Sequence, residues 1–241
     1  MFGEMRRLSV LWSNEPDVAN RLVETNVLAS GSRMRAKDVI TRAFVPRFVE
    51  SNPPDMWRIV AQLEGLNADV AVIRTVHYFA MARTEQIIRD FVIEFICPRY
   101  ERGILEVTTN DVVEFISACP SQKFSGGPWS SGVAVRVARG MLAALRDFGI
   151  LTGRSKKHIS AFEMSPLCFA TIAYIIRMKR VSGYQLLHDT EWKIFLLAPA
   201  SVERLFMECH QRKLLTYHAA GNIIRIDFPG NTMEQYLNAI F

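Results

Sequence analysis

The sequence lacks long uninterrupted apolar runs, and its few cysteines form no recognisable motif. It has four cysteines without any Cys-x-x-Cys pair, at Cys97, Cys119, Cys168 and Cys209. Residues 1–10 also show no secretory signal. The four cysteines are therefore expected to be reduced thiols in a cytoplasmic protein. The most apolar long segment, residues 132–151, contains three arginines and an aspartate. We therefore expect no membrane span.

Motifs for nucleotide, zinc and hydrolase chemistry are also missing. The sequence contains no Gly-x-x-x-x-Gly-Lys-Ser/Thr loop, no Gly-x-Gly-x-x-Gly, no Gly-x-Ser-x-Gly and no His-Glu-x-x-His, which argues against these enzyme classes. His77 has apolar neighbours and no second ligand at metal spacing, so a structural histidine is favoured over a catalytic one. We predict no enzymatic activity, no cofactor and no metal.

One triplet resembles nuclease chemistry. Glu191 and Lys193 form a Glu-x-Lys before an apolar run, and metal-dependent nucleases place such a triplet on a strand with an upstream Asp. The preceding segment is predicted to be helical and supplies no such Asp. The favoured interpretation is a strand edge whose apolar residues belong to the core, namely Trp192, Phe195 and Leu196.

Basic charge is concentrated in one segment of a chain whose net charge is +5. Residues 120–160 contain a single acidic residue, Asp147, and the basic residues Lys123, Arg136, Arg139, Arg146, Arg154, Lys156 and Lys157. Such local excess on a nearly neutral background indicates a surface for a polyanion. Solvated helix faces are the alternative.

Residues 15–48 predict two helices joined by a short turn. Ser32 is a suitable N-cap for the second helix. Four residues of that helix are expected to face inward: Met34, Val39, Ile40 and Ala43. Its start is basic, with Arg33, Arg35 and Lys37. Because a basic helix start is unfavourable for the helix dipole, contact with phosphate is one interpretation and a solvated basic end is the other.

The central segment has the layout of a winged helix. Three helices, at 55–63, 68–83 and 85–99, are expected to pack before it. A helix over 109–117 then precedes a long helix from Pro128 or Trp129 to Phe148, which Gly149 ends. Its predicted inward stripe is Val133, Val137, Met141, Leu145 and Phe148, opposite its arginines. Two short strands, 150–152 and 158–162, flank a basic turn over 153–157 whose side chains are expected to project into solvent.

A second unit of this kind is predicted at the end of the chain. Helices are expected at 166–179, 183–188 and 200–213, followed by a hairpin of strands 214–217 and 223–228. Its charges nearly cancel, with Arg225 beside Asp227. This second wing is therefore predicted to be structural or to bind a partner protein.

The fold class that follows is mainly α, with helix-turn-helix or winged-helix-like units and small β-hairpin wings. Three domains are predicted: a helical domain over 1–104, a central winged-helix-like unit over 105–165, and a C-terminal winged-helix-like unit over 166–241.

Several stretches resemble the BrxA family of BREX (bacteriophage exclusion) phage-defence systems. These are Ser32 to Lys37, Arg83 to Glu94, Trp129 to Leu151, Glu191 to Leu197, and Leu214 to Phe228. The resemblance implies a helical protein with winged-helix-like units, a DNA-binding role, and work alongside a methyltransferase, an ATPase and a phosphatase-like protein.

The function predicted is non-enzymatic binding of double-stranded DNA. The residues expected to contact DNA are Arg33, Arg35, Lys37, Lys123, Ser130, Ser131, Arg136, Arg139, Arg154, Lys156 and Lys157. The alternatives are a protein–protein adaptor in the BREX assembly and an RNA-binding protein that resembles an antitermination factor. A homodimer is compatible with either function.

Overall fold

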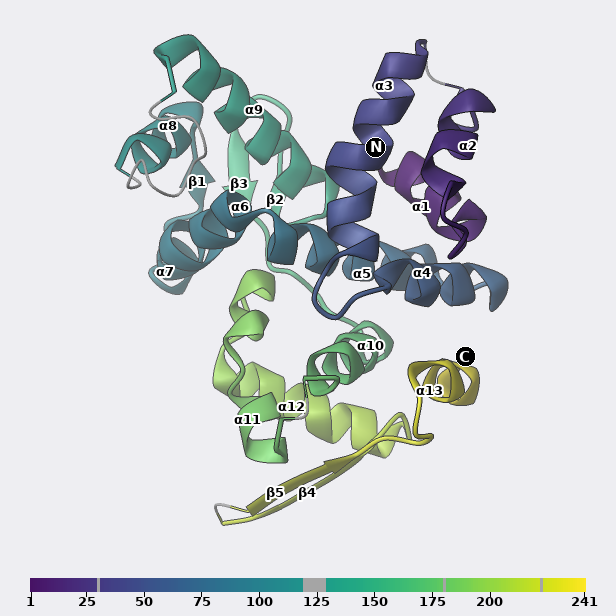
Figure 1. Cartoon of the computed structure of the whole chain (residues 1–241). Coiled ribbons are helices and arrows are strands. Elements are labelled where there is room, and N and C mark those ends of the chain that lie inside the picture. Colours follow the sequence, from purple (N-terminus) through teal and green to yellow (C-terminus); the bar gives the residue numbers. More distant parts are fainter. Residues whose placement is uncertain (30, 119–128, 180, 222) are drawn as a thin grey trace. The chain divides into compact units, whose positions relative to one another are not determined.

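The computed structural model describes residues 1–29, 31–118, 129–179, 181–221 and 223–241. The chain is mainly helical with small antiparallel strand pairs (Figure 1), as the sequence predicted. Its internal contacts divide it into two compact units. Unit 1 consists of residues 1–84, 165–188 and 202–241, and unit 2 consists of residues 85–164 and 189–201. Segments from the beginning and from the end of the sequence thus share one unit.

Unit 1 contains the elements at both ends of the sequence. Its first segment holds α1 (Phe2–Leu11), α2 (Val18–Glu24), α3 (Arg33–Asp38), the π-helical η1 (Val39–Val49), α4 (Met56–Gly65) and α5 (Val70–Thr84). Its later segments hold α10 (Pro166–Arg177), α11 (Gly183–Leu187), most of α12 (Pro199–Gln211), β4 (Thr216–Ala220), β5 (Ile223–Asp227) and α13 (Met233–Ile240). The predicted helices and hairpin are confirmed here, with small shifts of their ends.

Helix α10 forms the core of unit 1. Every residue from Cys168 to Ile176 is buried, and α10 packs against α5 and α13. An aromatic cluster closes this core: the ring of Tyr174 stacks on Tyr236 with 4.5 Å between centroids, and Phe228 lies edge-on to both rings. Because α10 is buried on all sides, it needs neighbours on every side. These neighbours come from segments before it, such as α5, and after it, such as α13, so unit 1 is assembled from separate segments.

The two helices predicted over residues 15–48 are present: α2 is the first, and α3 continued by η1 is the second. The side chain of Ser32 accepts a hydrogen bond from the backbone N–H of Arg35 and so caps α3 as predicted. Ile40 is fully buried, but Met34, which was predicted to face inward, is 68% exposed. The prediction for Met34 was wrong because the buried side of this helix runs through Ala36 and Ile40, and Met34 lies away from it.

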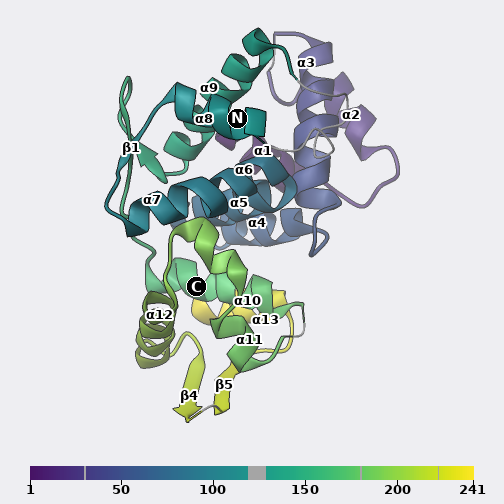
Figure 2. The same cartoon turned by 90° about the vertical axis from the view of Figure 1, so that its left-hand side faces the viewer.

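Unit 2 places two helices against a small sheet. Its elements are α6 (Gln86–Asp90), the π-helical η2 (Phe91–Ile96), α7 (Cys97–Glu101), β1 (Glu106–Val107), α8 (Thr109–Ala118), α9 (Ser131–Asp147), β2 (Leu151–Thr152), β3 (Lys157–Ile159) and the 3₁₀ helix η4 (Thr190–Phe195). Helix α8 packs against α9, and α9 packs against β2 (Figures 1 and 2).

The central sheet differs from the predicted two-stranded hairpin. It has three antiparallel strands in the order β1-β3-β2, with Glu106 opposite His158 and Leu151 opposite Ile159. Strand β3 also begins and ends earlier than the predicted 158–162. The third strand was not predicted because β1 is only two residues long, too short for an alternating pattern.

The segment after α11 is also not the predicted strand edge. Residues 190–195 form η4, in which Trp192 and Phe195 are buried, as is Leu196 directly after it. The prediction that these apolar residues belong to the core is therefore confirmed, and the prediction of a strand is wrong.

Of the helices that the structure describes, none has both the length and the apolar character that crossing a bilayer requires.

Candidate nucleic-acid interface

Helix α9 presents its arginines to solvent. Its buried side consists of Ala134, Ala138, Met141, Leu142 and Leu145. The buried side is rotated from the predicted stripe, because Val133 is 36% exposed and Val137 only half-buried. Arg136, Arg139 and Arg146 remain on the exposed side as predicted.

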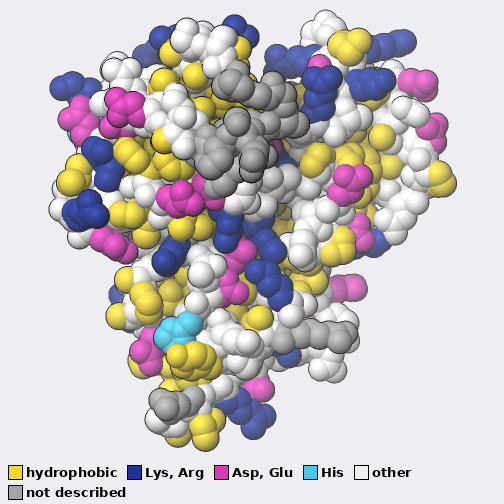
Figure 3. All heavy atoms as spheres, turned by 60° about the vertical axis from the view of Figure 1, so that its left-hand side comes forward, with side chains coloured by type: hydrophobic (Ala, Val, Ile, Leu, Met, Phe, Trp, Pro, Cys, Tyr) yellow, Lys and Arg dark blue, Asp and Glu magenta, His cyan; other side chains and the backbone are white. Residues whose placement is uncertain are grey.

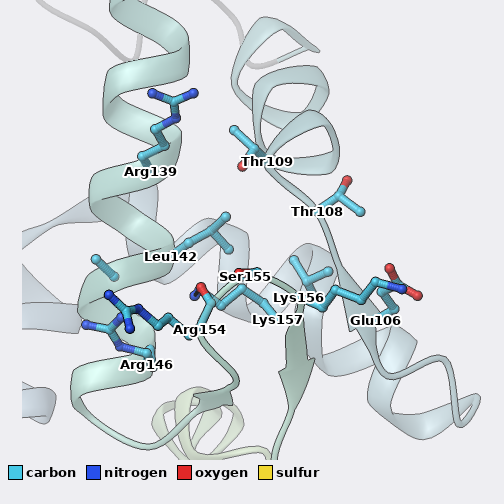
Figure 4. A pocket seen from close by; sticks show the side chains of 12 residues that line it. Glu106, Thr108, Thr109, Arg139, Leu142, Arg146, Arg154, Ser155, Lys156 and Lys157 are labelled. Carbon is cyan, nitrogen blue, oxygen red and sulfur yellow. Dashed lines mark hydrogen bonds between the residues drawn. The ribbon is translucent and has the colours of Figure 1, made fainter.

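A hollow of about 320 Å³ lies beside α9 within unit 2 (Figure 4). Three elements form its walls: the end of β1 with the start of α8, the second half of α9, and the turn between β2 and β3. Its lining residues are Glu106, Val107, Thr108, Thr109, Arg139, Leu142, Ala143, Arg146, Arg154, Ser155, Lys156 and Lys157. In Figure 4, Arg139 extends from α9 toward Thr109, and Arg146 and Arg154 lie at the other end of the hollow.

The hollow is strongly basic. Glu106 is the only acidic residue among the twelve that line it, against three arginines and two lysines. Within the described parts of the chain, no ion pair or side-chain hydrogen bond engages Arg139, Arg154 or Lys156. Arg146 is paired with its neighbour Asp147 at 2.7 Å. Cations that line a concave surface raise the local concentration of anions.

Lys157 has a different role from the one predicted. Its side chain was expected to project into solvent, but the residue is only 9% exposed. Its ammonium donates hydrogen bonds to the backbone carbonyls of Gly153, at 2.8 Å, and Arg154. Gly153 has φ +87°, and a Cβ on it would lie 2.0 Å from the carbonyl oxygen of Lys156. Lys157 and Gly153 therefore fix the turn, while Arg154 and Lys156 remain exposed on it.

We expect Lys157→Met to lower the free energy of unfolding by about 1–3 kcal/mol, because two turn carbonyls lose their charged donor. Urea denaturation at neutral pH measures this loss. The control is Lys156→Met, which changes the adjacent exposed lysine and should leave stability within about 0.5 kcal/mol of the parent. Equal stability of the two variants would show that the turn does not depend on Lys157.

Four of the other predicted site residues belong to α9 or to the sequence just before it. Ser130 and Ser131 are exposed at the start of α9, where Ser130 occupies the N-cap position but its side chain makes no capping hydrogen bond. Arg136 is exposed on α9, one turn before Gly140. Lys123 lies outside the described residues.

Arg33, Arg35 and Lys37 form a separate basic surface in unit 1. All three are exposed on α3, and Arg35 lies 3.9 Å from Glu4. Figure 3 shows lysine and arginine side chains gathered over this part of unit 1, at the upper right of the view. The predicted contact residues are thus distributed over two surfaces, one in each unit.

The structure describes a structural ion pair at the nuclease-like triplet. Glu191 is buried, and its carboxylate accepts a hydrogen bond from the guanidinium of Arg89 at 2.7 Å, whereas Lys193 is exposed. In the described ranges, no three His, Cys, Asp or Glu side chains come together as metal ligands would.

Burial raises the pKa of the Cys97 thiol, and it raises the pKa of the Cys209 thiol to about 12. Such thiols are poor nucleophiles.

The C-terminal hairpin is electrically balanced, as the sequence indicated. Arg225 and Asp227 form an ion pair at 2.6 Å on β5. Ile223 at the start of β5 is 74% exposed. This surface offers little attraction to a polyanion.

Sequence reasoning missed part of the hollow. Thr108, Thr109 and Ser155 line it but were not among the predicted contacts. Thr109 had been assigned to the start of a helix, which is correct. Only the pairing of β1 with β3 brings that helix start to the β2–β3 turn, and this pairing left no signal in the sequence.

Comparison with known proteins gave one result. Neither the curated proteins nor the solved structures include a match to this sequence. The model of the BrxA family matches residues 1–175, which is most of the chain and ends within α10. This chain belongs to the BrxA family.

Proposed function

We propose that unit 2 binds double-stranded DNA through α9 and the β2–β3 turn, without catalysing a reaction, as a component of a BREX system. Membership of the BrxA family suggests the BREX-associated role. The observation that carries the DNA-binding proposal is the hollow lined by Arg139, Arg154 and Lys156, in which Glu106 is the one acidic residue among the described lining residues. Phosphate contacts are the main source of affinity for duplex DNA.

The order of elements in unit 2 supports this proposal. The elements of unit 2 occur along the sequence in the order α7, β1, α8, α9, β2 and β3. The order of the strands in the sheet is β1-β3-β2. This is the order of a winged helix, in which α9 corresponds to the recognition helix and the β2–β3 turn to the wing. A recognition helix lies in the major groove, which would place Arg136 and Arg139 near phosphates or base edges.

We expect the affinity of the protein for a random 20-base-pair duplex to fall steeply with salt. Four to six phosphate contacts give a slope of log affinity against log salt of roughly −4 to −5. The double variant Arg154→Glu, Lys156→Glu should bind about tenfold or more weakly, because each reversed charge repels a phosphate. Fluorescence anisotropy measures both quantities. Lys157 is left unchanged because it fixes the turn.

The matched control is Arg225→Glu, a reversal of an exposed arginine on the neutral hairpin, which should leave affinity within about twofold. Melting curves establish that each variant is folded. A slope near zero, or a loss of affinity in Arg225→Glu alone, would contradict the proposal. Tighter binding to single-stranded RNA of equal length would favour the alternative of an RNA-binding protein.

The second candidate function is that of an adaptor within the BREX assembly. The observation that favours it is the hairpin in unit 1, where Ile223 is exposed beside the neutralised Arg225–Asp227 pair. Exposed apolar residues with little net charge suit a protein partner better than DNA. A methyltransferase, an ATPase and a phosphatase-like protein are the candidates that the family resemblance offers. Loss of co-purification with one of them in Ile223→Asp would support this function.

A further inference from the structure

An exposed methionine stands among the cations of α3. Met34 is 68% exposed, and its neighbours Arg33 and Arg35 are also exposed. The helix that carries Met34 is held firmly, because Ala36 and Ile40 are fully buried and Ser32 caps its first turn. The apolar side chain therefore projects from a rigid support.

The charges around Met34 are available to an anion. Arg33 and Lys37 are four residues apart, so they lie on one side of the helix. In the part of the chain that the structure describes, neither side chain has an ion pair or hydrogen bond. Arg35 is 67% exposed and only loosely associated with Glu4, at 3.9 Å. Asp38, the nearest acidic residue in the sequence, is paired with Arg42 at 3.3 Å.

We propose that the start of α3 is a second DNA-contacting surface, in which Met34 is an apolar wedge that enters the minor groove and bends the duplex. Arg33 and Lys37 contact phosphates on one side of Met34, and Arg35 lies on its other side. Proteins that bend DNA insert apolar side chains, methionine among them, between base steps while cations neutralise the backbone. The inference shares only its ligand, duplex DNA, with the proposed function, since the residues belong to the other unit.

A single methionine suits DNA better than an anionic membrane. Peripheral binding to lipid requires a broad apolar face on an amphipathic helix. The exposed residues around Met34 are Arg33, Arg35, Lys37 and Thr41. The hydroxyl of Thr41 donates to the carbonyl of Lys37. Such surroundings are polar. One apolar side chain is sufficient to unstack a base step.

The test is the change in end-to-end distance of a duplex on binding. A 30-base-pair duplex with a central, easily deformed TA step carries a donor and an acceptor dye at its ends. Saturation with the full chain should raise energy transfer. Met34→Ala should lose at least half of that rise while its affinity stays within about threefold. The control is Met207→Ala, which removes another exposed methionine of unit 1 and should keep the full rise.

The charge component has its own readout. Arg33→Ala combined with Lys37→Ala should reduce the salt slope by about 1.8, which corresponds to two phosphate contacts. An unchanged rise in energy transfer in Met34→Ala would overturn the wedge. So would binding of the wild-type chain to phosphatidylserine vesicles that Met34→Ala abolishes while the transfer signal is unaffected.

The same assay separates this inference from the proposed function. Arg154→Glu with Lys156→Glu tests unit 2 on the same duplex. If that variant binds like the wild type while Met34→Ala loses the bend, the wedge stands and the role of unit 2 is wrong. If the unit 2 variant binds weakly and Met34→Ala bends normally, the wedge is wrong and the proposed function stands.

Discussion

Replacing Glu191 by Ala is expected to lower the free energy of unfolding by about 3–5 kcal/mol. The side chains of Arg89 and Glu191 are 18% and 7% exposed, and their ion pair joins α6 to η4 in unit 2. Removal of the carboxylate leaves the guanidinium of Arg89 without its charged partner in a site with little water. The uncompensated charge, and not the lost attraction alone, accounts for the size of the effect. Urea unfolding monitored by far-UV circular dichroism measures it.

Two further variants show whether that reasoning is correct. Lys193→Ala, on the exposed side of the same η4, should change stability by no more than about 0.5 kcal/mol. Arg89→Met combined with Glu191→Leu should recover most of the loss, because neither charge is then buried alone. A loss below about 1 kcal/mol in Glu191→Ala would contradict the structural role. Manganese-dependent cleavage of plasmid DNA that Glu191→Ala abolishes would restore the nuclease interpretation.

Acidification is expected to destabilise the protein through His77. Burial lowers the pKa of His77 from 6.5 to about 3, and Arg6 and Arg47 add to the effect. Its ring lies 5.0 Å from that of Phe2 and 4.7 Å from that of Phe48, and no described residue hydrogen-bonds to its Nε2. Above pH 6.5 the histidine is neutral in both the folded and the unfolded chain, so stability does not depend on it there.

As the pH falls below 6.5, the unfolded chain takes up a proton that the folded chain excludes. The free energy of unfolding then decreases by about 1.4 kcal/mol per pH unit until the folded form also protonates near pH 3. Between pH 7 and pH 5 this amounts to about 2 kcal/mol. His77→Phe keeps an aromatic ring in the same apolar contacts and removes the titration. The variant should therefore lose about 2 kcal/mol less than the wild type over that interval.

Carboxylates that titrate below pH 5 affect both proteins alike, so the difference between the two denaturation series isolates His77. Equal acid sensitivity of wild type and His77→Phe would show that the histidine is accessible to protons in the folded state.

Features set by neighbouring residues were predictable from the sequence. The Ser32 cap depends on a hydrogen bond three residues away. Gly149, at φ +84°, ends α9 because only glycine adopts that conformation easily. The exposed side of α9 followed from helical spacing.

Features set by distant contacts were not predictable. The position of Met34 depends on which side of α3 is covered by other helices. Lysine is a residue type that is usually exposed, but the ammonium of Lys157 donates hydrogen bonds to two carbonyls of the turn. The hollow exists because β1 pairs with β3, across about fifty residues of sequence. In the sequence Glu191 resembles a metal ligand, but in the structure its carboxylate forms an ion pair with Arg89. No local pattern specifies such pairs.

The order in which the ribosome delivers the chain has a consequence for unit 1. Its first segment ends at Thr84, but its central helix α10 begins only at Pro166 and its last segment reaches residue 241. At roughly 5–20 residues per second, translation from Thr84 to the end of α10 at Arg177 takes about 5 to 20 seconds. During that time α5 has no α10 to cover it, while nearly all of unit 2 emerges as one continuous stretch. Unit 2 can therefore fold first, and the nascent N-terminal helices need protection from aggregation until the last segment leaves the ribosome.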